Sequence, residues 1–258
     1  MNTWKKQMPI SIKASSQIPW QKKLAPIIAE GLKKRNMGYN INGDKGIPMV
    51  LGPNVHKHHE IEPYLQVNRY FVGTKPNAVH ETVAISWNGF NGLGQFNIDL
   101  IDEDRLWKFI SPSDIKEWKT DGKDYLLCDQ VDNGRSDIDL EQWKRKITVP
   151  YRSRPHISKK PPPLIDDLKN VKAALTFNST VGVECLLHGI PVVAYDKGNP
   201  LYPFVGHTAE DIQYPDRIKA LTLLANCQYT YDEIADGNWF QRLYEPRETK
   251  LYEYTKKI

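Results

Sequence analysis

The sequence has 258 residues, a formal net charge of +4 and 40% apolar residues, enough to fill the core of one large domain or two small ones. No apolar run approaches the roughly 20 residues of a membrane-spanning helix. Residues 1–20 also lack the apolar segment of a secretory signal, so we expect a soluble, cytoplasmic protein without membrane attachment. The mild positive charge permits a polyanionic partner but does not require one.

The first half of the chain reads as short strands and helices. Apolar residues at helical spacing predict an amphipathic helix over residues 18–37, with Gly38 as its stop. A Gly/Asn-rich loop is predicted at 88–96. The remaining elements expected here are strands at 47–52, 64–73 and 81–90 and short polar helices at 102–110 and 112–122.

Strands and helices also alternate in the second half. Three prolines at 161–163 mark a loop before a short helix. The expected strands are 123–130, 147–157, 172–177 and 191–196. The expected helices are 140–147, 179–189, 214–228 and 230–246, followed by a terminal helix or tail.

This alternation predicts an α/β protein with parallel packing, in which two similar halves that meet near residue 120 each form a small Rossmann-like sheet. We expect a first domain at 1–120, a second domain at 121–240 and a C-terminal helix or tail at 241–258. Ligands in such sheets bind beyond the carboxyl ends of the strands. The loops that follow the predicted strands are therefore the candidate sites.

One such loop opens the helix predicted at 179–189. Free backbone N–H groups and hydroxyls at a helix start favour an anion such as a phosphate, and a carboxylate one turn further in can accept from a ribose hydroxyl. The candidate residues are Asn178, Ser179, Thr180, Gly182 and Glu184. Ordinary helix capping by Ser or Thr explains the same pattern.

Two other strand ends carry polar residues. Arg154 and His156 lie in a basic stretch that can hold a diphosphate or form a solvated surface loop. Gln130, Asp132 and Ser136 lie in a loop where a carboxylate can serve as base or nucleophile, or simply form a turn.

The sequence shows no pattern typical of a metal site or of redox-active cysteines. The "HKHH" stretch at 56–59 lacks further ligands at zinc spacing, so we expect no metal. No Walker loop, GxGxxG, GxSxG or HExxH motif is present. Three widely spaced cysteines, Cys128, Cys185 and Cys227, predict reduced, buried thiols.

Several of these motifs, in this order, resemble the capsule-type β-Kdo glycosyltransferases. The segments are "SWNGFNGLGQF" (86–96), "YLLCDQVDNGRS" (125–136), "RSRPHI" (152–157) and "TFNSTVGVECLLHGIPVVAYDKGNPLY" (176–202). A second set of segments resembles small phage-encoded glycosyltransferases: Asp104–Trp107, "EWKTDGKDYLL" (117–127), Arg154–His156 and "LANCQYTYDEIADGNWF" (224–240). The resemblance covers about residues 80–240. The chain departs from the capsule family at the loop carboxylate, where it has Gly134.

The resemblance implies a GT-B-like fold, in which the parallel sheets of two Rossmann-like domains face a central cleft that holds the active site. It makes 1–120 the acceptor-side domain and 121–240 the nucleotide-sugar-binding domain. By position, Gln130, Ser136, Arg154, His156, Asn178, Ser179, Thr180, Gly182 and Glu184 would form the donor nucleotide site. Asn88, Phe90, Asn91 and Gln95 would lie on the acceptor side. Asp132, His156 and Asp102 are the catalytic candidates, and either Asp99 or Asp102 would be the base of an inverting reaction.

We therefore predict a glycosyltransferase with a UDP-, CMP- or GDP-linked sugar as cosubstrate and no prosthetic group or metal. The acceptor that we favour is a hydroxymethylated pyrimidine in phage DNA, in the host cytoplasm, with the target base flipped out of the stack. A polysaccharide or small glycoside acceptor, or an inactive nucleotide- or DNA-binding module, are the alternatives. A monomer or a homodimer is expected.

Overall fold

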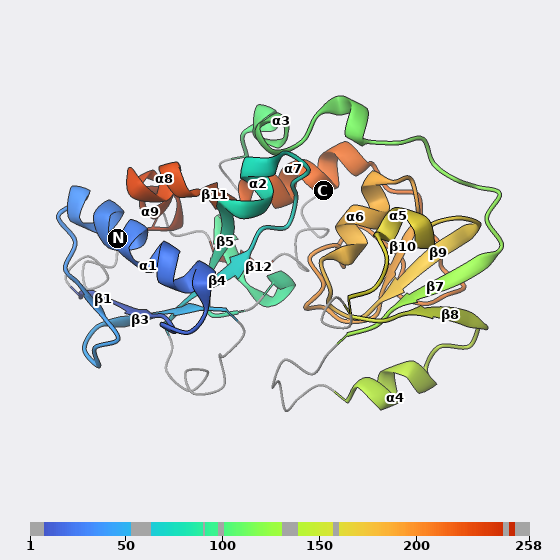
Figure 1. Ribbon diagram of the computed structural model, residues 1–258, viewed down its shortest axis with the longest axis horizontal. Helices are drawn as coiled ribbons and strands as arrows, with labels where there is room; N and C mark the ends of the chain where they lie inside the picture. Colours follow the sequence, from blue (N-terminus) through green and yellow to red (C-terminus); the bar gives the residue numbers. More distant parts are fainter. Residues whose placement is uncertain are drawn as a thin grey trace.

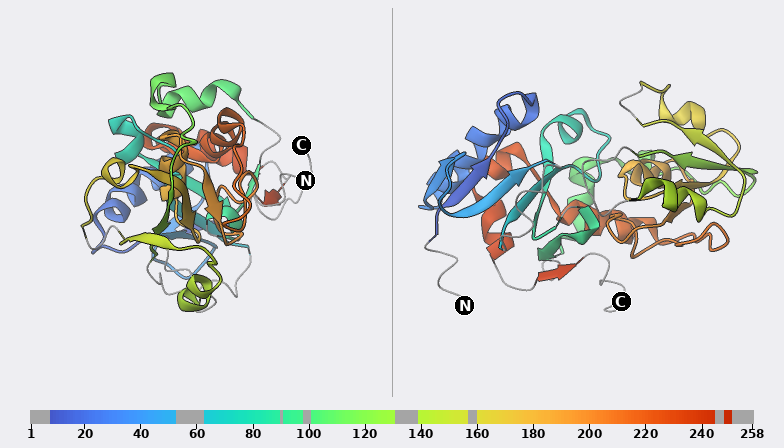
Figure 2. Two further views of the ribbon diagram at one scale, coloured as in Figure 1. Left: turned by 90° about the vertical axis from the view of Figure 1, so that its right-hand side faces the viewer. Right: turned by 90° about the horizontal axis from the view of Figure 1, so that it is seen from below.

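The computed structural model describes residues 8–52, 63–89, 91–97, 101–130, 139–156, 160–244 and 248–250. Its strands form two sheets that lie in two adjoining units, as the views in Figures 1 and 2 agree. Helices pack on both sheets. The α/β class with two Rossmann-like units is thus confirmed.

The first sheet is parallel at one side and antiparallel at the other. Its strand order is β12-β6-β5-β4-β3-β1-β2, with β11 also paired to β5. β1 to β4 run parallel to one another, whereas β5, β6, β11 and β12 join through antiparallel pairs. The strands are β1 (Ile10–Lys13), β2 (Tyr39–Ile41), β3 (Ile47–Leu51), β4 (Leu65–Arg69), β5 (Thr82–Trp87), β6 (Gln95–Asn97), β11 (Gln228–Thr230) and β12 (Glu248–Lys250).

The predicted amphipathic helix is α1 (Pro19–Lys34). It begins with a proline at its first position, where the missing N–H costs nothing. Its buried face includes Leu24, Ile28 and Leu32, spaced four residues apart, and packs on the first sheet. The helix ends before Gly38, because Asn36 takes the left-handed conformation (φ 54°) that stops it.

The short 3-10 turn η2 (Asn91–Leu93) lies between β5 and β6 of the first sheet. A longer connection from β6 to the second sheet contains the 3-10 turns η3 (Glu103–Arg105) and η4 (Pro112–Asp114) and the helix α3 (Leu106–Phe109). The helix predicted at 112–122 is wrong beyond its first turn. There the backbone N–H groups of Lys116 and Lys119 donate to the carbonyls of Leu187 and Gly189 at 2.8 Å each, so tertiary contacts replace helical ones.

The second sheet is fully parallel, in the order β10-β9-β7-β8. Its strands are β7 (Asp124–Cys128), β8 (Tyr151–Arg154), β9 (Val171–Thr176) and β10 (Val192–Ala194). Its helices are α4 (Leu140–Arg145), α5 (Leu164–Asp167), α6 (Val181–Leu187) and α7 (Arg217–Asn226). Leu126 and Leu127 are both fully buried but belong to different core clusters, as expected for a strand covered on both faces.

The chain then returns to the first unit. β11, α8 (Tyr231–Ala235), α9 (Asn238–Tyr244) and β12 complete the first sheet and its helical layer, and α8 packs against α1 (Figure 1). The described residues from 228 onward, at 228–244 and 248–250, therefore belong with the first sheet, so the second unit does not extend to residue 240. α2 (Pro76–His80) is the remaining helix of the first unit. Across the described residues, no helix combines the length and apolar character needed to cross a bilayer.

Candidate active site

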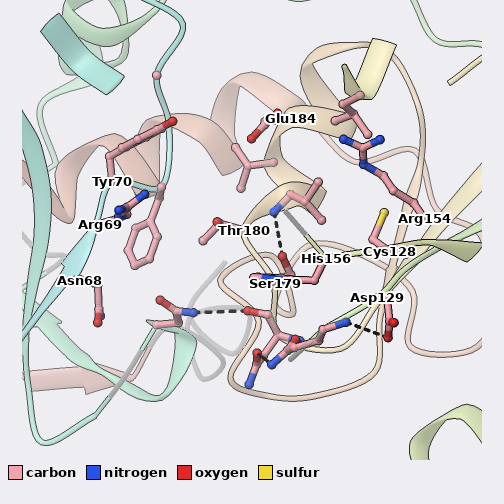
Figure 3. A pocket seen from close by; sticks show the side chains of 18 of the residues that line it. Asn68, Arg69, Tyr70, Cys128, Asp129, Arg154, His156, Ser179, Thr180 and Glu184 are labelled. Carbon is pink, nitrogen blue, oxygen red and sulfur yellow. Dashed lines mark hydrogen bonds between the residues drawn. The ribbon is translucent and has the colours of Figure 1, made fainter. Parts of the chain in front are cut away.

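The carboxyl ends of five parallel strands meet at one cavity between the two units. Residues directly after β3 and β4 line it from the first unit, and residues at the ends of β7, β8 and β9 line it from the second (Figure 3). Its volume is about 590 Å³, which lies within the usual range for small-molecule sites. The strand-end rule therefore places the cavity correctly.

Two predicted residues hold the second wall together. The Gln130 side-chain amide donates to Asn178 Oδ1, and its oxygen accepts from the Asn178 backbone N–H at 3.1 Å. Both residues are more than nine-tenths buried. This reciprocal pair joins the ends of β7 and β9 at the cavity. Many of the hydrogen-bonding groups of Gln130 and Asn178 are therefore already bonded to each other and not to a ligand.

The loop after β5 ties the two units together at the same place. Asn91 Nδ2 donates to the Asn178 carbonyl at 3.3 Å, and the Gly92 N–H donates to the Gly198 carbonyl at 2.9 Å. Asn91 lines the cavity. Asn91 therefore lies on the first-unit side of the site, and its hydrogen bond also helps to fix the two units relative to each other.

At the start of α6, the Ser179 hydroxyl caps the helix, whereas the Thr180 hydroxyl does not. Ser179 Oγ accepts from the Val181 N–H at 3.3 Å, as in ordinary capping. Thr180 makes no side-chain cap hydrogen bond, and both residues line the cavity. Gly182 does not line it: a Cβ there would lie 3.2 Å from Val192 and 3.3 Å from Leu201 side chains, so this glycine serves close helix packing.

His156 and Arg154 both line the cavity after β8, but Arg154 is not a free cation. Its guanidinium forms an ion pair with Asp167 and donates to the Pro162 carbonyl at 2.9 Å. Asp167 also pairs with Arg152 at 3.0 Å. The phosphate-binding capacity that we predicted for Arg154 is thus reduced by an internal carboxylate.

Glu184 carries the perturbed carboxyl of the site. Its side chain is open to solvent from the cavity, yet desolvation by the surrounding protein raises the pKa of the carboxyl above its usual value, while the Arg154 charge opposes this. From the other wall, Tyr70 points toward it (Figure 3). Burial raises the pKa of Tyr70, the negative charge of Glu184 raises it further, and Arg69 lowers it.

Three predicted site residues lie elsewhere. Asp102 accepts from the Asp104 N–H at 3.1 Å as the cap of η3, and its own N–H donates to Asn226 Oδ1 at 2.9 Å, so it does not reach the cavity. Asn88 accepts from the Tyr64 N–H at 3.0 Å and donates to Gln95 Oε1 at 3.1 Å. β5 runs antiparallel to β4, which puts Asn88 beside the start of β4, away from its carboxyl end.

Five sequence features fall outside the described residues: Asp99, Asp132, Ser136, Phe90 and the "HKHH" stretch at 56–59. Within the described ranges, no three or more His, Cys, Asp or Glu residues gather in a way that could hold a metal ion. The three cysteines are buried free thiols, as predicted.

The first-unit wall of the cavity is not among the predicted site residues. Asn68, Arg69 and Tyr70 follow one another at the carboxyl end of β4, and Trp20 of α1 also lines the cavity. The strand predicted at 64–73 runs on past these residues, whereas β4 ends at Arg69, so the strand-end rule applied to the sequence does not point to them.

Comparison with known proteins gives structural neighbours but no match by sequence. No protein-family model matches the sequence, and no curated protein matches it. Among solved structures, the KpsC β-Kdo 2,7-transferase of Thermosulfurimonas dismutans aligns with a TM-score of 0.47 and 11% identity, covering 90% of this chain and 99% of that one. The KpsC β-Kdo 2,4-transferase of the same organism aligns with a TM-score of 0.43 and 15% identity, covering 86% and 90%. Because both TM-scores lie below 0.5, we infer the function from the cavity.

Proposed function

We propose that the protein is a nucleotide-sugar-dependent glycosyltransferase whose reaction takes place in the cavity between the two units. One observation carries the proposal: parallel strands of both sheets direct their carboxyl ends at this single cavity, with polar side chains on both walls. A transferase needs such a two-walled site, because donor and acceptor must be held together in reacting geometry.

The donor belongs on the second-unit wall. His156, Ser179 and Thr180 present an imidazole and two hydroxyls there, which can hydrogen-bond the phosphates of a nucleotide and stabilise the phosphate that departs. Such stabilisation requires no metal ion. The nucleotide base and the sugar are left open among UDP-, CMP- and GDP-linked donors.

The transfer itself moves one proton and one glycosyl group. The acceptor O–H loses its proton to a base, its oxygen forms the new bond to the anomeric carbon, and the electron pair of the broken bond leaves with the phosphate oxygen. Glu184, whose carboxyl pKa is raised, and His156 are the described candidates for the base. Asp132 remains a prediction.

The acceptor that we favour on structural grounds is a glycan or small glycoside instead of DNA. Two lysines of α1 are paired with carboxylates and so offer less charge to a DNA backbone: Lys23 pairs with Glu81 at 2.9 Å, and Lys34 with Glu30 at 3.1 Å. Binding to DNA depends on many unpaired cations and weakens steeply with salt. Transfer to hydroxymethylated DNA that falls steeply between low and moderate salt would reinstate the nucleic-acid acceptor.

The proposal is tested by nucleotide binding and donor hydrolysis. UDP, CMP and GDP are tested for thermal stabilisation of the chain, and the matching sugar nucleotides for slow release of nucleotide without acceptor, with and without EDTA. His156→Ala should weaken binding of the stabilising nucleotide about 10-fold. His80→Ala, on exposed α2 away from the cavity, is the matched control. Absence of stabilisation by all three nucleotides would contradict the proposal.

One observation favours a second candidate, a nucleotide-binding module without transferase activity. The internal pairing of Arg154 with Asp167 removes the strongest cation from the donor wall. Such a module would be stabilised by a nucleotide yet release none from any sugar donor, whereas the enzyme does both.

A further inference from the structure

The first-unit wall of the cavity contains a buried hydrogen-bond donor that has no partner. Asn68 is 2% exposed and lines the cavity, and its Nδ2 finds no acceptor among the residues that the structure describes. Leaving a buried amide donor without a partner is unfavourable. A ligand or a water molecule in the cavity would supply the missing acceptor.

The orientation of this amide follows from its neighbours. Gln66 Nε2 donates to the Gly52 carbonyl at 2.7 Å, so this end of Gln66 must be the nitrogen. The same nitrogen faces Asn68 Oδ1 at 3.4 Å. Asn68 therefore turns its oxygen toward Gln66, and its NH₂ group is the part left without a partner.

Gly52, directly after β3, also lines this wall of the cavity. Its φ of +88° suits glycine, and an added Cβ would lie 2.8 Å from Gln21 Nε2 and 3.3 Å from the Trp20 ring. Gln21 is itself fixed, because its Nε2 donates to the Leu51 carbonyl at 2.6 Å. The indole of Trp20 thus stands at the cavity wall as a flat apolar surface on which a sugar ring can lie.

Arg69 adds a positive charge at the same wall. Its side chain is exposed and lines the cavity, and no carboxylate among the described residues forms an ion pair with it. Arg154 on the opposite wall, by contrast, is paired with Asp167. An anion that enters the cavity can therefore bind the Arg69 guanidinium on the first-unit side (Figure 3).

We propose that Asn68, Arg69 and Trp20 form a subsite for an anionic sugar, in which the Asn68 amide donates to a ring or hydroxyl oxygen and Arg69 binds a carboxylate or phosphate. That this sugar is the acceptor rests on the proposed function. The subsite itself does not, because it is defined by these three side chains and the cavity.

Direct binding tests the subsite without any transfer reaction. Methyl glucuronide, which carries a carboxylate, and glucose 1-phosphate, which carries a phosphate, are titrated calorimetrically against the full chain, with methyl glucoside as the neutral probe. We expect at least one acidic probe to bind more tightly than methyl glucoside, and the tighter of the two identifies the anion. Arg69→Gln should weaken acidic-probe binding about 10-fold or more, while methyl glucoside changes little.

Asn68→Asp is the second variant. It keeps the oxygen that faces Gln66 but replaces the donor with a charged acceptor, so acidic probes should bind at least about 10-fold more weakly. Arg145→Gln, at the exposed end of α4, is the matched control and should bind as the parent does. Thermal unfolding checks that each variant is folded, and Arg69→Gln, being at an exposed position, remains decisive if Asn68→Asp is not.

Three results would overturn the subsite: no binding of either acidic probe at about 10 mM, equal binding of neutral and acidic probes, or unchanged binding in folded Arg69→Gln. Nucleotide stabilisation is measured on the same samples. If acidic probes bind through Arg69 while no nucleotide binds, the glycosyltransferase proposal fails and the subsite stands. If nucleotides bind but the probes do not, the subsite fails alone.

Discussion

The ion pair between Arg105 and Glu233 joins the connection that leaves the first sheet to the segment that later returns to it. Its contribution to stability can be measured directly. Arg105 lies in the connection after the first sheet and is 7% exposed, and Glu233 lies in α8. The two side chains form two parallel hydrogen bonds of 2.9 Å, and Lys108 adds a third contact to Glu233 at 2.7 Å. The Glu233 carboxylate also accepts from the Thr230 N–H at 2.8 Å.

These contacts determine the stability that Glu233 contributes. Burial by itself would raise the pKa of its carboxyl, but the hydrogen bonds and charges of Arg105 and Lys108 outweigh this and lower the pKa from 4.5 to about 2. A difference of this size corresponds to about 3 kcal/mol at neutral pH. Because the folded-state pKa is lowered, this stabilisation is complete above pH of about 5 and is lost as the pH falls toward 2.

The test is Glu233→Gln, which cannot ionise and leaves the buried Arg105 charge without its partner. Urea unfolding at pH 7 should show a loss of about 3–5 kcal/mol relative to the parent chain. At pH 3 the difference in unfolding free energy should shrink to about half or less, because the stabilisation by the Glu233 carboxylate of the parent chain is then partly lost. Glu103→Gln, exposed in the same connection, is the control and should change stability by less than about 0.5 kcal/mol.

A loss below about 1 kcal/mol at pH 7, or a loss that does not depend on pH, would refute this reasoning. Either result would mean that the pair is no better than an exposed salt bridge.

Three further outcomes are expected. Gly92→Ala should destabilise the chain by about 1–3 kcal/mol in urea unfolding, because its Cβ would lie 2.6 Å from the carbonyls of Lys197 and Asn199; an unchanged midpoint would contradict this close approach between the units. Glu184→Gln should lower the pKa of Tyr70, since a negative charge that opposes the tyrosinate is removed, and a tyrosine titration by NMR that does not move would contradict their proximity. The three thiols should react with a thiol reagent only as fast as the chain unfolds, and rapid labelling of the folded protein would contradict their burial.

The sequence predicts helices and strands best where one pattern dominates. α1 is found because its apolar residues repeat at helical spacing and all contribute to one core. β1, "ISIK", is not found, because four residues carry too little pattern and its partners β2 and β3 lie far along the chain. The helix predicted at 112–122 fails because local propensity was weaker than backbone hydrogen bonds to residues near 187–189.

The residues of the site also divide into those that the sequence predicts and those that it does not. The strand-end rule brings His156, Thr180 and Glu184 to one cavity, since it depends only on parallel topology. It fails for Asn88, because nothing in the sequence reveals that β5 runs antiparallel. It also cannot show that Arg154 is already paired with Asp167, which is a matter of side-chain contacts between β8 and α5.

The return of the chain to its first sheet imposes an order on biosynthesis. β5 leaves the ribosome early, but its partner β11 and the Trp239 side chain that packs in the same core follow only after the whole second unit has been translated. Until then the nascent chain exposes an unpaired strand edge and part of an uncovered apolar surface, which are the features that promote aggregation. Production of this protein should therefore be more sensitive to loss of its last segment, or to premature termination, than to changes of similar length in its surface loops.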